Sequence, residues 1–140
     1  MSAEKISRGE RNCNPLNLIK GIKWQGLRPE QNDSRFCQFQ SMKYGWRAAL
    51  INLRSYITGA NGKRQPADTI EKIVMRWAPP HENNTEAYIK CVSAAVGIDR
   101  RTRVRWNDRA LVCAICKAMA YQECGKLFPI EDIYSVYDII

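Results

Sequence analysis

The sequence predicts a mainly α-helical protein with a small loop or hairpin region near its N-terminus. Residues 41–140 repeat apolar side chains at intervals of three and four, the period of an amphipathic helix. The first forty residues lack this period and concentrate asparagine, proline and glycine, which are typical of turns. At 140 residues, of which 45% are hydrophobic, the chain has the size of one domain, and we expect a single domain over residues 1–140.

The first two expected helices follow this turn-rich region. One begins at Ser41, whose hydroxyl can cap it, and ends at Gly59. The next begins at Asp68, because Glu71 stands three residues later with the spacing of a capping box. Pro79 and the proline after it stop this second helix.

Two longer helices and a short terminal one complete the expected fold. The third helix runs from near Asn84 to Gly97, a natural left-handed cap. The fourth is capped by Asn107 or the aspartate after it, runs to Gly125, and is the most hydrophobic, so we expect it at the centre of the core. The tail after Pro129 has apolar residues at helical spacing and is expected as a short helix, although its β-branched residues make a strand nearly as plausible.

A dense group of polar and aromatic residues lies between positions 8 and 26 and is a candidate binding site. Its members are one carboxylate, three asparagines and a tryptophan: Glu10, Asn12, Asn14, Asn17 and Trp24. Trp24 lies in a loop and is the best candidate to stack on a sugar ring, whereas Trp46 and Trp77 fall on helical stripes and are expected in the core. The alternative is a well-ordered turn whose asparagines bond to the backbone.

The net charge favours anionic partners. Lys and Arg number 22 against 14 Asp and Glu, a formal charge of +8. Nucleic acid, an anionic lipid surface and the acidic bacterial cell wall all fit this charge. Five arginines crowd residues 100–109, but the helix that follows is apolar, so a solvated surface loop is expected there rather than a site for nucleic acid.

Neither a membrane segment nor a metal or other cofactor is expected. No run of 18 apolar residues occurs, and the first ten residues lack the apolar stretch of a secretory signal, so we expect synthesis in the cytoplasm without a signal peptide. The six cysteines lie in apolar contexts and are expected as thiols. Cys113-x-x-Cys116 lies within a helix without a nearby histidine, and a peptidase pairing Cys13 or Cys37 with His81 would need coincidence.

Glu82 is a second candidate carboxylate, in the polar connection between the second and third expected helices. A glutamate beside the apolar ring of Trp77 can remain protonated and act as a general acid, with Asn83 and Asn84 holding sugar hydroxyl or acetamido groups. The structural alternative is that Glu82 favours the positive end of the third helix while Asn84 caps it.

The segment E-R-N-C-N-P-L-N, from Glu10 to Asn17, resembles the E-S-x-x-N-P-x-A element of the lytic transglycosylase branch of the lysozyme superfamily. In that family the glutamate is the general acid that protonates the glycosidic oxygen, so the resemblance implies this role for Glu10 and a lysozyme-like helical fold. The chain departs from the pattern in two respects. At most nine residues precede Glu10 where the family has a long helix, and the usual G-L-M-Q element is missing.

A longer pattern is similar to a family of small phage and Bacteroides-type proteins described as virion structural proteins. It includes the Asn-Pro pair, Trp24-x-Gly26 and a segment R-W-A-P-P-x-E-N-N-T-x-x-Y-I at residues 76–89. This resemblance spans most of residues 8–98 and implies a lysozyme-like helical fold and a role on peptidoglycan.

The expected function is cleavage of the glycan strands of bacterial peptidoglycan, by a muramidase or lytic transglycosylase acting at the cell wall or in a phage particle. Glu10 is the first candidate for the general acid and Glu82 the second, while Arg47 or Arg76 would contact peptide carboxylates. One alternative is a non-catalytic phage virion structural or cell-wall-binding protein, with other virion proteins as further partners. The other is a nucleic-acid-binding module.

Overall fold

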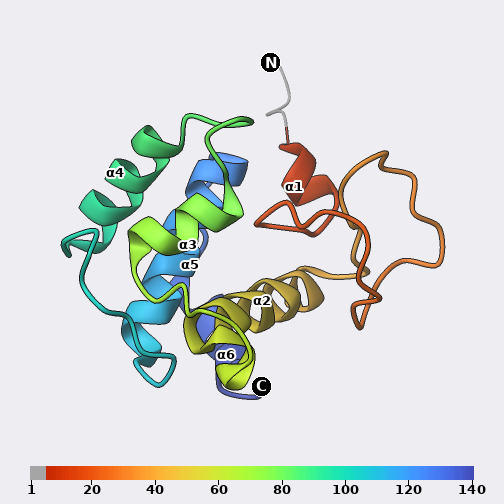
Figure 1. Ribbon diagram of the computed structural model, residues 1–140. Helices are drawn as coiled ribbons and strands as arrows, with labels where there is room; N and C mark the ends of the chain where they lie inside the picture. Colours follow the sequence, from red (N-terminus) through yellow and green to blue (C-terminus); the bar gives the residue numbers. More distant parts are fainter. Residues whose placement is uncertain (1–5) are drawn as a thin grey trace.

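The computed structural model describes residues 6–140 and is mainly α-helical, which confirms the predicted fold class. Figure 1 shows the helices, which are joined by turns and loops. Within the described residues they are α1 (Arg8–Arg11), α2 (Met42–Gly62), α3 (Ile70–Trp77), α4 (Thr85–Val96), α5 (Arg109–Cys124) and α6 (Ile130–Tyr137). No helix in this part of the chain is both long and apolar enough to cross a membrane.

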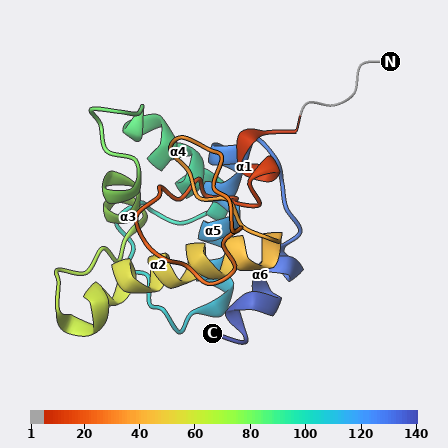
Figure 2. The same cartoon turned by 90° about the vertical axis from the view of Figure 1, so that its right-hand side faces the viewer.

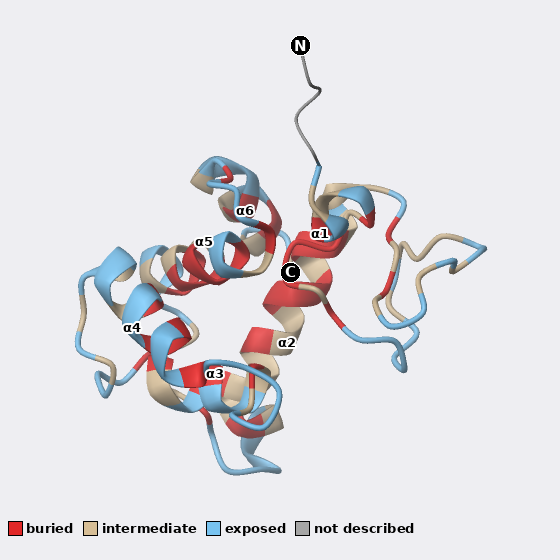
Figure 3. Ribbon diagram, turned by 90° about the horizontal axis from the view of Figure 1, so that it is seen from above, coloured by how far each residue is buried: buried red, intermediate tan, exposed pale blue. Residues whose placement is uncertain are grey.

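The main hydrophobic core surrounds α5, as its composition predicts. This helix packs against α4, α6 and α1, and its residues Ile115, Cys116 and Met119 are fully buried. From the other side of the core, α2 contributes Trp46 and Leu50 among others. Figure 3 shows the buried positions gathered along the facing sides of α2 and α5, with exposed residues on the outer turns. The arrangement follows from the apolar stripes, which can be removed from water only by facing one another.

Helix caps in the structure follow the expected residues with two corrections. Ser41 is the N-cap residue of α2, but its side chain makes no capping hydrogen bond, so the predicted hydroxyl cap is wrong. Asn84 and Asp108 accept hydrogen bonds from the first turns of α4 and α5, and a left-handed glycine ends each of these helices. The second predicted helix, however, is capped by Thr69, whose hydroxyl accepts from the amide of Lys72. Asp68 instead pairs with basic side chains on the surface. The prediction of a capping box at Asp68 is therefore wrong by one residue, because threonine reaches the same backbone amides.

The C-terminal end of α2 turns left-handed. Gly59, Ala60 and Asn61 have φ angles of 63°, 51° and 59°, so the right-handed helix ends where the sequence predicts, at Gly59. A Cβ atom on Gly59 would collide with the carbonyl oxygen of Arg64. Glycine is therefore required at this position both for its conformation and for the space that it leaves.

The turn-rich segment of residues 12–41 contains isolated bridges rather than regular strands. Antiparallel bridges join Ile19 to Phe36 and Leu27 to Phe39, which reduces the predicted hairpin to two single contacts. The segment lies over α2, as Figure 2 shows, and has a small core of its own in which Leu18 and Phe39 pack on Ala48.

Trp77, at the end of α3, connects this small core to the main one. Its ring packs against both clusters, and its indole N–H donates to the carbonyl of Leu16 at 3.3 Å. The N-terminal segment also contacts the end of α5, since the thiol of Cys124 donates to the carbonyl of Pro15 at 3.2 Å. These contacts fix the distance between the N-terminal segment and the helices, and a cleft lies between them.

Candidate functional site

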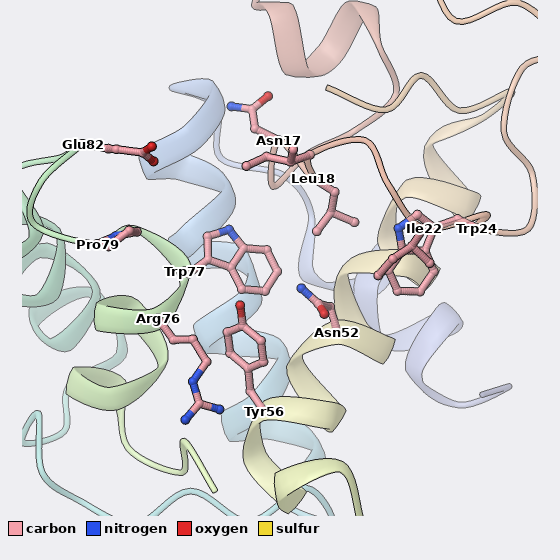
Figure 4. Close-up of a pocket in the computed structure, with 11 residues that line it drawn as sticks. Asn17, Leu18, Ile22, Trp24, Asn52, Tyr56, Arg76, Trp77, Pro79 and Glu82 are labelled. Atoms are coloured by element: carbon pink, nitrogen blue, oxygen red, sulfur yellow. The ribbon is translucent and has the colours of Figure 1, made fainter. Parts of the chain in front are cut away.

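The cleft consists of two adjoining cavities of about 300 and 170 Å³. Both are lined by Asn17, Ile19, Trp77 and Glu82. The larger cavity extends between α2 and α3, and Figure 4 shows the side chains that line it, which come from the N-terminal segment, from α2, from α3 and from the connection after α3. The smaller cavity extends toward the C-terminal end of α5 and reaches Glu123.

Aromatic side chains form the wall of the larger cavity. Tyr56 and Trp77 meet edge to face with their ring centroids 5.5 Å apart, and the guanidinium of Arg76 lies over the ring of Tyr56 at 5.3 Å. Burial raises the pKa of the Tyr56 hydroxyl, which therefore stays neutral. Trp24 lines the cavity from the N-terminal segment. Flat, half-buried rings with polar groups at their edges suit a sugar, whose ring has an apolar face and hydroxyls around it.

Glu123 is a half-buried carboxyl group at the smaller cavity. Its Oε1 accepts a hydrogen bond from the side-chain amide of Asn17 at 3.0 Å, and its Oε2 accepts one from the hydroxyl of Tyr88 at 3.1 Å. Burial raises the pKa of Glu123, and the two hydrogen bonds only partly oppose this effect. Glu123 also lies in the last turn of α5, where the carbonyl end of the helix disfavours a negative charge.

Glu82 lies at the rim of the cleft in a more exposed setting. Its side chain is 47% exposed, and one oxygen lies 3.4 Å from the guanidinium of Arg35. The imidazole of His81 lies 3.7 Å from the other oxygen. The cleft therefore holds two carboxyl groups in different environments: Glu123 is half-buried and bonded to neutral groups, and Glu82 is more exposed and paired with a cation.

The structure separates the predicted asparagines into two groups. Asn12 and Asn14 are buried and bond to protein groups: Asn12 donates to Asp33, and Asn14 bonds to the backbone of Leu18 and Cys37. These two fit the structural alternative of a well-ordered turn.

The other predicted asparagines lie near the cleft. Asn17 lines both cavities, and Asn83 lines the smaller one. Asn84 is occupied as the N-cap of α4, where its side chain accepts from the amide of Ala87. Asn17 and Asn83 therefore remain as candidates for contact with a ligand.

Glu10 lies apart from the residues that line the cleft. One of its oxygens accepts from Ser7, and the other lies 3.3 Å from the ammonium group of Lys126. Arg47, on α2, is likewise absent from the cleft lining, whereas Arg76 lines the larger cavity. Of the two predicted carboxylates and two predicted arginines, the fold thus brings Glu82 and Arg76 to one site.

The tryptophans follow the predictions in part. Trp46 is 1% exposed and packs edge to face on Phe128, which confirms it as a core residue. Trp24 lines the larger cavity, and its stacking on a sugar ring stays a prediction. Trp77 was expected only to pack in the core, and this expectation is incomplete because the same ring also lines both cavities.

Sequence reasoning missed Glu123, its partner Tyr88, and the cleft residues Arg35 and Tyr56. A signal for Glu123 exists in the sequence: it follows Met119 by four residues and Cys116 by seven, so it falls on the buried stripe of the most hydrophobic helix. A carboxylate on such a stripe must be paired or neutral, and both conditions mark functional sites.

The arginine-rich segment is held by ion pairs on the surface. Arg100 contacts Glu71 at 2.6 Å and Glu86 at 2.5 Å, and Arg103 lies 3.4 Å from Asp68. These carboxylates neutralise part of the positive charge that a phosphate backbone would need.

The remaining reactive side chains are the cysteines, which are free thiols. The cysteines are unpaired; Cys113, Cys116 and Cys124 are buried, which raises their thiol pKa values, while Cys91 is exposed. Among residues 6–140, no group of three or more His, Cys, Asp or Glu side chains is placed to hold a metal ion.

Comparison with known proteins relates the chain to a bacteriophage protein. No protein-family model matches the sequence. Protein P5 of Pseudoalteromonas phage PM2 is 36% identical to it over 126 residues, which cover 87% of this chain and 74% of that protein. The match includes most of the residues described above, so similarity extends over most of both chains. The chain therefore belongs to the family of the phage protein P5.

Proposed function

We propose that the cleft binds a glycan strand of bacterial peptidoglycan and cleaves a glycosidic bond in it, with Glu123 as the general acid. The observation that carries this proposal is a half-buried carboxyl group with a raised pKa, which lines a cleft together with aromatic and amide side chains. The relationship to a phage protein supports the choice of substrate, because phages must pass the cell wall of their hosts.

In this reaction Glu123 donates its proton to the glycosidic oxygen as the bond to the anomeric carbon breaks. A raised pKa keeps the carboxyl group protonated closer to neutral pH, which a general acid requires. Glu82, which is paired with Arg35, is the second carboxylate: it stabilises the positive charge that develops on the sugar ring. This assignment replaces Glu10, which lies outside the cleft.

The other cleft residues match the parts of a peptidoglycan strand. Trp24 and Trp77 offer ring faces and edges to the pyranose units, and Asn83 offers an amide to hydroxyl or acetamido groups. Arg76 lines the larger cavity, whereas Glu123 lines the smaller one, and we expect the Arg76 guanidinium to bind the carboxylates of the peptide stem.

One observation favours a second function, in which a virion or cell-wall-binding protein holds the glycan without cleaving it. Both carboxyl oxygens of Glu123 already accept hydrogen bonds from the protein, from Asn17 and Tyr88. A carboxyl group satisfied in this way is also a stable structural element, and the surrounding cleft would still bind sugar.

The deciding experiment incubates purified peptidoglycan with the wild type and with Glu123→Gln, Glu82→Gln and Glu10→Gln variants, and identifies released fragments by mass spectrometry. We expect Glu123→Gln to lower the rate of release by about 10²–10⁴-fold, because a glutamine cannot supply the proton. Glu131→Gln, an exposed change on α6, is the matched control and should leave the rate unchanged.

The results of this experiment distinguish which glutamate is the general acid and whether the protein cleaves peptidoglycan or only binds it. Loss of activity with Glu10→Gln alone would restore that residue as the acid and contradict the role of Glu123. If the wild type releases no fragments but sediments with peptidoglycan, cleavage is refuted and the binding function takes its place. New reducing ends would indicate hydrolysis, and anhydro sugars would indicate ring closure.

A further inference from the structure

Glu123 is held from both sides by residues of other elements. Asn17, from the N-terminal segment, donates its side-chain amide to Oε1 at 3.0 Å and to the main-chain carbonyl of Glu123 at 3.3 Å. Tyr88, from α4, donates its hydroxyl to Oε2 at 3.1 Å. Three segments that lie far apart in the sequence therefore determine the orientation of one carboxyl group.

The two partners differ in what they can do when the carboxyl group is protonated. The amide nitrogen of Asn17 faces two oxygen acceptors, so it must be the donor, and a donor cannot accept a proton from Oε1. A tyrosine hydroxyl can donate to an ionised carboxylate and can accept from a neutral carboxylic acid. A proton on Oε2 can be donated to the Tyr88 hydroxyl, whereas a proton on Oε1 finds no acceptor in the Asn17 amide nitrogen. The surroundings of Glu123 therefore favour the proton on Oε2.

We propose that Tyr88 and Asn17 are positioning residues, which hold the Glu123 carboxyl group in one orientation at the cleft and keep its transferable proton on Oε2. The inference rests on the proposed role of Glu123 as the acid, and it adds the residues that make this role possible. Without Asn17 the proton could occupy either oxygen, and without Tyr88 the oxygen that carries the proton would lose its only side-chain partner within the described residues.

The other groups near this pair do not replace these contacts. The thiols of Cys116 and Cys124 lie close to Tyr88, and burial keeps both thiols neutral. Across the smaller cavity, Arg35 and Glu82 pair with each other. Burial also raises the pKa of Tyr88 well above its usual value, so its hydroxyl remains available as a hydrogen-bond partner over the whole working range of pH.

The test compares the wild type with Tyr88→Phe and Asn17→Gly. Phenylalanine preserves the ring of Tyr88, and glycine tolerates the φ of 52° at position 17. The first readout is the ¹³C carboxyl titration of Glu123 by NMR, with its signal assigned by its loss in Glu123→Gln. The second is the pH dependence of fragment release from peptidoglycan. Tyr121→Phe is the matched control, because it removes an exposed hydroxyl from α5, the helix that carries Glu123.

We expect each variant to raise the pKa of Glu123 by about one pH unit, because the ionised form loses a hydrogen-bond donor. The alkaline limb of the activity profile should move upward by a similar amount, and the maximal rate should fall about tenfold because the carboxyl group is less well oriented. A loss of stability alone would lower the rate of fragment release without moving the alkaline limb of the activity profile. Tyr121→Phe should titrate like the wild type.

The proposal is overturned if Glu123 titrates identically in the wild type and in both variants. If Tyr88→Phe fails to fold, the Asn17→Gly titration decides alone, because the same shift is expected from it. If the wild type does not cleave peptidoglycan but the titration moves as expected, the positioning contacts stand and the catalytic function fails. The two proposals can thus be judged separately.

Discussion

At the scale of single residues, the asparagines of the N-terminal segment divide by the atoms that they face. Asn14 faces backbone groups of its own segment, which its side chain satisfies, whereas Asn17 faces a carboxyl group on a helix 106 residues later in the chain. Both are asparagines in one short motif, and the sequence alone gives them the same weight. Only the partner shows that one builds the segment and the other belongs to the cleft.

Asn14→Ala should destabilise the protein by about 2–4 kcal/mol, because the amide and carbonyl of Leu18 and the carbonyl of Cys37 lose a buried partner. Urea unfolding followed by circular dichroism measures this change. Asn83→Ala, at an exposed position, is the control and should cost less than about 0.5 kcal/mol. Equal effects of the two changes would contradict the structural role of Asn14.

Glu123→Gln should change how stability depends on pH. Because the pKa of Glu123 is raised in the folded state, the folded protein binds this proton more tightly than the unfolded chain does. The wild type should therefore lose stability, relative to the variant, as the pH rises from the ordinary glutamate pKa of about 4.3 through the folded value. Urea unfolding of both proteins at several pH values between 4 and 8 tests this, and parallel curves would show that Glu123 is not buried as described.

At the scale of elements, the sequence predicts helices better than it predicts the segment before them. Periodicity locates α2 to α6, and Gly97 and Gly125 end α4 and α5 as expected because only glycine readily takes a left-handed cap. The start of α3 is displaced from Asp68 to Thr69, since either side chain can cap and tertiary contacts decide. The N-terminal segment has no period to detect, because buried asparagine side chains, rather than a strand ladder, connect its turns.

The left-handed turn that ends α2 is sensitive to the side chain at Gly59. Gly59→Ala should cost more than about 1–2 kcal/mol, because the left-handed conformation is unfavourable for alanine and the new Cβ meets the carbonyl of Arg64. Gly62→Ala provides the comparison: its φ is also positive, at 89°, but a Cβ there meets open space. Thermal unfolding of both variants should rank Gly59→Ala as the less stable, and the reverse order would refute this account of the turn.

At the scale of the whole molecule, the cleft exists because two cores of unequal size meet at Trp77. The main core is built from helices, while the smaller one holds the N-terminal segment against α2. Motif spacing could identify Glu82 and Arg76, which lie close together in the sequence, but could not pair Asn17 with Glu123. Contacts between residues so far apart in the sequence depend on how the helices pack, and this packing cannot be read from a single sequence.

The two cores should differ in local stability. Amides at the centre of α5, such as those of Ile115 and Met119, should exchange hydrogen only by global unfolding, because the helix is buried on several sides. Amides of Lys20, Arg28 and Gln40, bonded across isolated turns, should exchange faster by local opening. Native-state hydrogen exchange measures both groups, and equal protection would mean that the chain opens as one unit.

The cleft residues lie far apart in the sequence, so cutting the chain into two fragments would divide them between the fragments. The exposed stretch from Lys63 to Pro66 lies between α2 and α3, where a cut would disturb few buried groups. The first fragment would carry Asn17, Trp24 and Tyr56, and the second would carry Trp77, Glu82, Tyr88 and Glu123. Neither fragment would contain the complete cleft. A split form of this protein would therefore form the site only when its two fragments reassemble, and binding could be controlled by controlling that assembly.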